Sequence, residues 1–124
     1  MNLMRIRLEL ARTPEFPSGN ARHGYEFVAP LTAEGHIDSQ AWTTVKNKCV
    51  VRHFWNGHDD KSGFLLHVGH GWKFDYGTQD DAEDEAFFKL DRHTLAAGDY
   101  VSVTESDGVM RPFKIVAITP LNRV

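Results

Sequence analysis

The sequence has little cysteine, no long apolar run and no excess of positive charge. Cys49 is the only cysteine among the 124 residues, so an internal disulfide and an extracellular disulfide scaffold are excluded. No stretch approaches the roughly 18 consecutive apolar residues of a membrane-spanning helix. The first residues alternate between apolar and polar, unlike the continuous apolar segment of a signal peptide. These absences predict a cytoplasmic protein that binds no membrane.

The charges are mixed along the chain, and the formal net charge is −3 at pH 7 with the histidines neutral. Basic residues of the first half, such as Arg5, Arg7 and Arg52, are interleaved with acidic ones such as Glu9 and Glu26. This mixing leaves no concentrated basic face of the kind that nucleic-acid-binding domains usually carry. We therefore expect no nucleic-acid partner.

The composition is that of a globular protein, with 41% hydrophobic and 25% charged residues. The length matches the usual size of one domain, roughly 100–150 residues. Neither an internal repeat nor a linker interrupts the sequence. We expect residues 1–124 to form a single β-barrel-like domain.

Most of the chain alternates apolar and polar residues with a period of two, which indicates strands with one buried face. The clearest example is Met4, Ile6, Leu8 and Leu10, which are separated by mainly polar residues. The pattern predicts strands over residues 4–10, 24–29, 49–55, 63–68, 72–76, 87–90, 100–103 and 110–118. We expect the second of these to stop at Pro30, because proline lacks the amide hydrogen that a strand ladder needs.

One short helix is predicted over residues 39–46. Asp38 is a good N-cap, because its carboxylate can accept from the unpaired amide hydrogens of the first turn. Ile37 and Trp42 occupy the two positions of a hydrophobic staple. The fold class is therefore mainly β, with six to eight strands and one short helix. A closed or partly open small barrel is the expected architecture, since closure removes exposed strand edges.

Seven histidines are the most unusual feature of the composition. Four of them fall near the hairpin of residues 49–68. If Trp55 pairs opposite Phe64, His53 and His67 lie on opposite faces of that hairpin. A metal site formed by His53, His67 and His70 would then need a bulge to bring its ligands together. The alternative is a set of surface or half-buried histidines on a β face.

Two other features favour ordinary structural roles. The acidic run of residues 80–85 lacks the spacing of a calcium-binding loop and is expected to be a solvated loop. Cys49 opens a strand, where a buried and unreactive thiol is the common case.

The whole chain resembles a small uncharacterised family of bacterial β-rich proteins. The residues that carry this resemblance are the run from His23 to Thr32, Trp42, and the run from Gly98 to Val103. The resemblance implies no particular chemistry.

A second, local resemblance lies in the last quarter of the chain. Residues 98–103 and 111–115, with the Asp107-Gly108 turn between them, are similar to the flavin barrel of ferredoxin-reductase-like enzymes. The resemblance implies that Arg111 would contact flavin phosphate and that Phe113 would stack on the flavin ring. Lys114 departs from the serine that this family has at the next position.

The leading hypothesis is a non-catalytic β-barrel module that binds a protein partner or a small ligand, with no resident cofactor. Self-association into a homo-oligomer is a further option. The rival hypothesis is a metal- or flavin-dependent protein that uses the histidine cluster or Arg111. A third is a small enzyme whose acid–base group is His53 or His67, because only histidine titrates near neutrality without perturbation.

Overall fold

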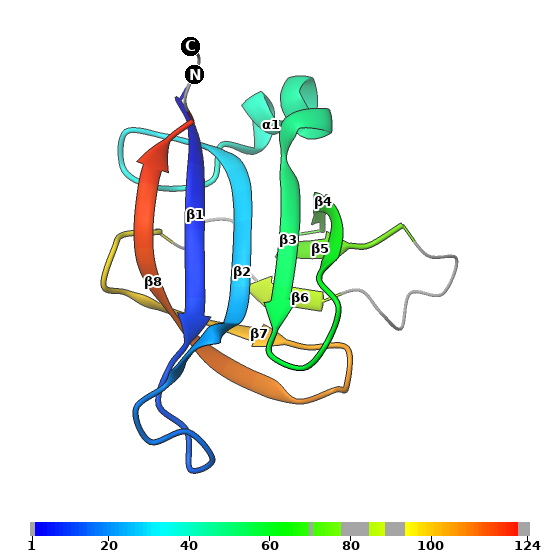
Figure 1. Ribbon diagram of the computed structural model, residues 1–124. Coiled ribbons are helices and arrows are strands. Elements are labelled where there is room, and N and C mark those ends of the chain that lie inside the picture. The colour runs from blue at the N-terminus through cyan, green and yellow to red at the C-terminus, as the bar shows by residue number, and fades with distance from the viewer. Residues whose placement is uncertain (1, 70, 78–84, 89–93, 122–124) are drawn as a thin grey trace.

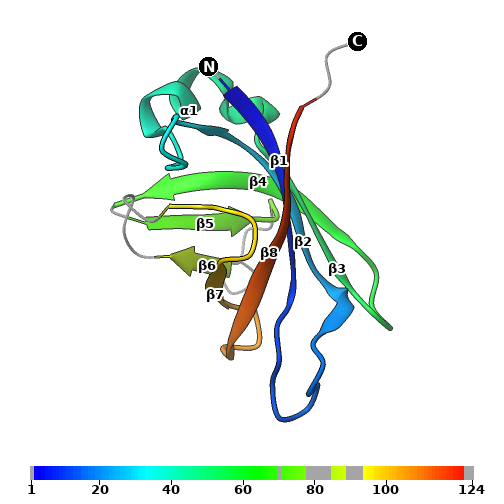
Figure 2. The same ribbon diagram turned by 90° about the vertical axis from the view of Figure 1, so that its left-hand side faces the viewer.

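The computed structural model describes residues 2–69, 71–77, 85–88 and 94–121, drawn in Figures 1 and 2. Its strands are β1 (Asn2–Leu10), β2 (Asn20–Leu31), β3 (Val50–Trp55), β4 (Lys61–Val68), β5 (Gly71–Asp75), β6 (Glu85–Phe88), β7 (Tyr100–Thr104) and β8 (Met110–Pro120). A short helix, α1 (Ser39–Val45), is followed by one 3-10 turn, η1 (Lys46–Lys48).

Within the described residues, the strands form a closed barrel in the order in which they occur in the sequence. Each strand pairs antiparallel with the next, and β8 returns to pair with β1. Figure 2 shows β4, β5 and β6 crossing the long strands β1, β2 and β8. The predicted class is confirmed: the fold is mainly β, barrel-like, and has one short helix.

The interior of the barrel is filled by the side chains that alternate inward from each strand. In β1, for example, Ile6 and Leu8 are fully buried and lie opposite Phe27 and Tyr25 of β2. The remaining large buried side chains include Trp72, Phe74, Phe113 and Ile115. Burial of apolar surface on this scale is the main force that holds the barrel together. None of the helices among the described residues is long and apolar enough to span a membrane.

Helix α1 fills the space at one end of the barrel, where β2 and β4 extend beyond β3. The Asp38 carboxylate accepts from the amide of Ala41 at 3.0 Å, as predicted for an N-cap. The amide of Asp38 donates to the carbonyl of Pro30 at 2.8 Å, and Trp42 Nε1 donates to the carbonyl of Leu65 at 3.0 Å. The helix segment therefore bridges the free ends of two strands.

One expectation about the strands was wrong. Strand β2 does not stop at Pro30 but runs to Leu31. The β3 ladder ends at Phe27, so Pro30 lies beyond it, opposite Leu3 of β1, and on its other side it only accepts a hydrogen bond, from the amide of Asp38. No β3 ladder bond needs the amide hydrogen that proline lacks.

The register of the β3–β4 hairpin differs from the Trp55–Phe64 pairing considered in the sequence analysis. Val50 lies opposite Phe64 and His53 lies opposite Lys61, so Trp55 does not pair with Phe64. Gly63 lies opposite Val51 and allows β5 to approach β4 closely, because a Cβ at that position would collide with the carbonyl oxygen of Asp75. The two registers differ by five residues, an odd number, so His67 lies on the same face of the hairpin as His53.

The two ends of the described chain lie side by side in Figure 1. The amide of Leu121 donates to the carbonyl of Leu3 at 3.0 Å, just beyond the β1–β8 ladder. The barrel is therefore closed by its first and last strands.

Candidate metal centre

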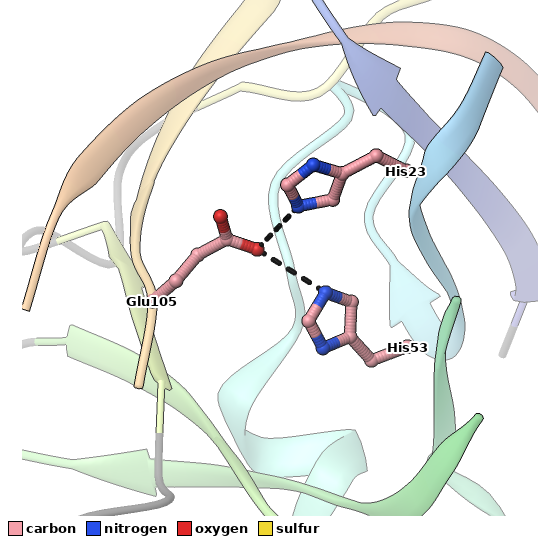
Figure 3. A group of neighbouring side chains, drawn as sticks. All are labelled: His23, His53 and Glu105. Atoms are coloured by element: carbon pink, nitrogen blue, oxygen red, sulfur yellow. Dashed lines mark hydrogen bonds and ion pairs between the residues drawn. The ribbon is translucent and has the colours of Figure 1, made fainter. Parts of the chain in front are cut away.

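Three titratable side chains converge inside the barrel, at the end opposite α1. His23 comes from the start of β2, His53 from β3, and Glu105 directly follows β7 (Figure 3). Each continues the inward alternation of its strand: His23 precedes the buried Tyr25, and Glu105 follows the buried Val103. The exposed fractions are 1% for His23, 5% for His53 and 2% for Glu105, so the group is closed to solvent.

One oxygen of Glu105 is the meeting point of this group. His23 Nε2 lies 2.8 Å from Glu105 Oε2, and the Tyr25 hydroxyl donates to the same atom at 2.7 Å. His53 Nε2 lies 3.1 Å from it. Two imidazole nitrogens and one phenol therefore surround a single carboxylate oxygen.

The surroundings keep Glu105 ionised. Burial by itself raises the pKa of this carboxyl, but hydrogen bonds with His23, His53 and Tyr25 outweigh that effect. The pKa of Glu105 is held far below its ordinary range. Because an ionised carboxylate only accepts hydrogen bonds, His23 carries its hydrogen on Nε2 in this arrangement.

The second carboxylate oxygen of Glu105 is bound by Arg111. Arg111 Nη1 donates to Glu105 Oε1 at 2.8 Å, and Arg111 Nη2 donates to Asp107 Oδ2 at 2.8 Å. Hydrogen bonding to Asp107 first, and to Glu105 as well, raises the pKa of Arg111 despite partial burial. The guanidinium also lies 5.1 Å from the centre of the Trp55 ring, within cation–π range. Arg111 thus fixes the orientation of the Glu105 carboxylate.

Aromatic rings hold both imidazoles in place. Trp55 stacks on His23 with ring centres 4.0 Å apart, and Tyr25 stacks on His53 at 4.3 Å. Phe113 meets both His23 and Tyr25 edge-on. The rings limit rotation of the imidazoles, so the nitrogens remain directed at Glu105.

The donor atoms have the chemistry and spacing of a metal site. One nitrogen from each histidine and one carboxylate oxygen all lie within 4.8 Å of one another. Ligand atoms at the edges of a tetrahedral zinc site are about 3.3 Å apart, given Zn–N and Zn–O bonds of about 2.0–2.1 Å. To admit an ion, the 2.8 and 3.1 Å separations would need to widen toward this value, by about 0.5 and 0.2 Å.

The structure places the predicted metal ligands in different parts of the fold. His53 belongs to the converging group. His67 lies near the α1 end, stacked on Trp72 with ring centres 4.3 Å apart and edge-on to Trp42. His70 lies outside the described residues.

The two residues predicted from the flavin resemblance adjoin the same group. Arg111 contacts Glu105, as described above. Phe113 is fully buried, and its ring packs against His23 and Tyr25 in the barrel interior.

Sequence reasoning missed His23, Tyr25 and Glu105 as members of the site. Their signal was the alternation itself: His23, Tyr25 and Phe27 share one face of β2, and Val101, Val103 and Glu105 share one face of β7. A histidine or glutamate at a position where the pattern requires an apolar residue marks a buried polar group.

The fold and this group together define a closed antiparallel barrel with a buried cluster of two histidines and one glutamate. No protein-family model matches the chain, and no solved structure matches it. Curated proteins from two strains of Mycobacterium tuberculosis, both described as "Putative prophage phiRv2 integrase", are 28% identical to it over 102 residues. The match covers 74% of this chain and 27% of each integrase. The chain therefore spans about a quarter of the length of these relatives, and the match establishes no specific function.

Proposed function

We propose that this chain is a metal-binding β-barrel module, with His23, His53 and Glu105 as the ligands of one first-row transition-metal dication such as Zn²⁺. The observation that carries the proposal is the crowding at Glu105 Oε2. A carboxylate oxygen has about two lone-pair sites. Tyr25 and His23 already use two, and His53 brings a third donor within 3.1 Å.

A metal ion resolves this crowding. Bound between the three atoms, it would accept one lone pair from Nε2 of each imidazole and one from Glu105, with the His23 ring hydrogen moved from Nε2 to Nδ1. Imidazole nitrogen with carboxylate oxygen suits zinc and other first-row dications better than calcium or magnesium, which prefer oxygen ligands alone. The alternative is a purely structural network in which the same side chains only satisfy the buried charge of Glu105.

Tyr25 and Arg111 would act as outer partners of the metal site. Both donate to Glu105, one to each oxygen, and Tyr25 also stacks on His53. Residues of this kind orient the ligands and are needed for tight binding. The Tyr25 hydroxyl, 2.7 Å from Glu105 Oε2, is an oxygen that could supply a fourth ligand.

The burial of the ligands favours a closed structural site over a catalytic one. Catalytic zinc sites keep a position open for water or substrate, whereas structural sites are enclosed by protein. Here all three ligands are nearly inaccessible to solvent. This supports a non-catalytic module whose small ligand is the metal. The integrase match, which covers a quarter of that protein, supports the idea of a unit that also occurs within longer chains.

The test is the metal content of protein purified without a metal-affinity step, from cells grown with added zinc. We expect about one equivalent of metal by elemental mass spectrometry for the wild type. His23→Asn and His53→Asn should each reduce the metal to a small fraction of an equivalent. His58→Asn is the matched control, since His58 is exposed and outside the cluster.

Circular dichroism must show that the variants fold for these losses to count. If the variants do not fold, zinc titration of the wild-type apoprotein is the second measurement. The NMR signals of the imidazole nitrogens of His23 and His53 should then shift as zinc is added. Metal-free wild type with unchanged imidazole signals on zinc addition would contradict the proposal and leave the structural network.

A further inference from the structure

A cavity lies outside the buried cluster, between the β1–β2 loop and the β7–β8 turn. It has a volume of about 320 Å³ and is lined by residues 10, 12–16 and 109–112. Ligand pockets in proteins usually have volumes from about 300 Å³ upward. The size is therefore that of a site for a small molecule.

The loop that forms one wall is held in place by its own hydrogen bonds. The amide of Thr13 donates to the carbonyl of Phe16, and the amide of Phe16 donates to the carbonyl of Thr13, each at 3.0 Å. The Thr13 hydroxyl also accepts from the amide of Phe16 at 3.1 Å. Next to the loop, the amide of Ala11 donates to the carbonyl of Pro112 at 2.9 Å, which fixes the two walls against each other. The cavity is built into the fold.

The cavity gathers exposed apolar side chains from both walls. Phe16 is 40% exposed, Val109 46% and Met110 60%. These side chains come from segments about 90 residues apart and meet around one cavity. Exposed apolar side chains grouped at a pocket are typical of a binding site.

Two arginines line this cavity, and they differ in their partners. Arg111 is held by Asp107 and Glu105. Arg12 is exposed, and no ion pair joins it to any residue in the described part of the chain. Glu15, on the same loop, is the one negative side chain among the lining residues. The site thus offers a guanidinium that no other described residue pairs with, beside an apolar surface.

We propose that this cavity binds a small amphipathic carboxylate, with its aliphatic chain against Phe16 and Met110 and its carboxylate at Arg12. Charge complementarity favours a carboxylate headgroup, because Arg12 is the cation lining the cavity that forms no ion pair with another described residue. The apolar side chains of the walls favour an aliphatic chain as the rest of the ligand. This site is independent of the metal proposal, since it shares only Arg111 with that cluster, and Arg111 keeps its contacts to Glu105 and Asp107.

The test is a set of titrations followed by amide chemical shifts. Octanoate, hexanoate and butanoate are the probes, with octan-1-ol and octylamine as matched ligands of different charge. We expect shifts centred on residues 12–16 and 109–112. Affinity should rise about fourfold for each added methylene, the factor equivalent to about 0.8 kcal/mol per buried methylene.

Two substitutions on the same loop give effects of opposite sign. Arg12→Gln should weaken octanoate binding up to about fivefold, as expected for one exposed charge contact. Glu15→Gln should strengthen it slightly. Neither should alter the binding of octan-1-ol. Arg5→Gln, outside the cavity, is the control and should change nothing.

Several outcomes would overturn this proposal. Octylamine binding more tightly than octanoate would show that the site selects cations. Shifts confined to other residues would place the ligand elsewhere. Shifts at Phe16 and Met110 that depend on protein concentration without ligand would identify the patch as a contact between two copies of the chain.

Discussion

Glu105 lies 82 positions from His23 in the sequence, yet its Oε2 is 2.8 Å from His23 Nε2. The contact forms because β2 and the end of β7 face each other across the interior of the closed barrel. No local pattern joins the two residues. The Glu105 carboxylate at this contact carries a buried charge, so replacing it should lower the free energy of unfolding.

Glu105→Gln should be strongly destabilising. The change replaces the buried carboxylate that His23, Tyr25 and Arg111 contact with a neutral amide, and removing one partner of a buried pair costs about 3–5 kcal/mol. Asp107→Asn is the matched variant, because Asp107 pairs with the same guanidinium but has a side chain 42% exposed. It should cost no more than about 1 kcal/mol. Urea unfolding measures both, and equal small losses would mean that Glu105 contributes little.

Zinc should raise the melting temperature of the wild-type apoprotein. An ion that binds only the folded state stabilises it by about 2.7 kcal/mol when its free concentration is 100 times Kd. His23→Asn and His53→Asn should lose most of this response, while His58→Asn keeps it. Thermal unfolding with and without added zinc is the measurement. An equal zinc response in all four proteins would assign the effect to other groups.

Cys49 should be unreactive in the folded protein. Its thiol is fully buried, and this desolvation raises its pKa to about 11, above the ordinary value of 9.0. A chromogenic disulfide reagent at pH 8 should modify it only after denaturation. Rapid modification of the native protein would contradict the burial of this side chain.

The same shift predicts a loss of stability at high pH. The folded state holds the thiol proton more tightly than the unfolded state, so the contribution is complete below about pH 9 and declines as the pH rises toward 11. Relative to Cys49→Ala, the wild type should lose about 1.4 kcal/mol between pH 7 and pH 10. Urea unfolding of both proteins at several pH values measures this difference, and a constant difference would argue against the raised pKa.

Gly24→Ala should disrupt the barrel. A Cβ at this position would collide with the carbonyl oxygen of Leu8 and press against the Phe54 ring. Because the main obstacle is backbone, the cost should reach or exceed about 3 kcal/mol. Gly57→Ala is the comparison: it has a φ of +88° but open space around it, so it should cost only about 1 kcal/mol. Urea unfolding of the two variants tests the difference, and similar losses would mean that the strand contact yields easily.

The strands and the helix could be predicted because their signals are local. The period of two in residues 4–10 and 110–118 follows from the burial of one strand face. The start of α1 follows from the cap at Asp38, whose carboxylate needs only a nearby amide. Such features depend on neighbours within a few positions, so one sequence is enough to find them.

The register of β3 on β4 could not be predicted in the same way. Phe64 lies opposite Val50, and no pattern within the hairpin distinguishes this register from one that places Phe64 opposite Trp55. The convergence of His23, His53 and Glu105 depends on the closure of the whole barrel. The sequence indicated His53 as a candidate ligand but could not show which other strand would supply its neighbours.

The bond between Leu121 and Leu3 has a consequence for how this barrel can be joined to other protein. If the polypeptide continued beyond Leu3 and beyond Leu121, the two connecting segments would leave the barrel next to each other. The barrel could then be inserted into a surface loop of a host protein without distorting the host fold, since domain insertions are tolerated where the two junctions are close together. By the same geometry, a short peptide linking residues 3 and 121 would permit the chain to be opened instead at Gly57, giving a circular permutant with the same strand order around the barrel.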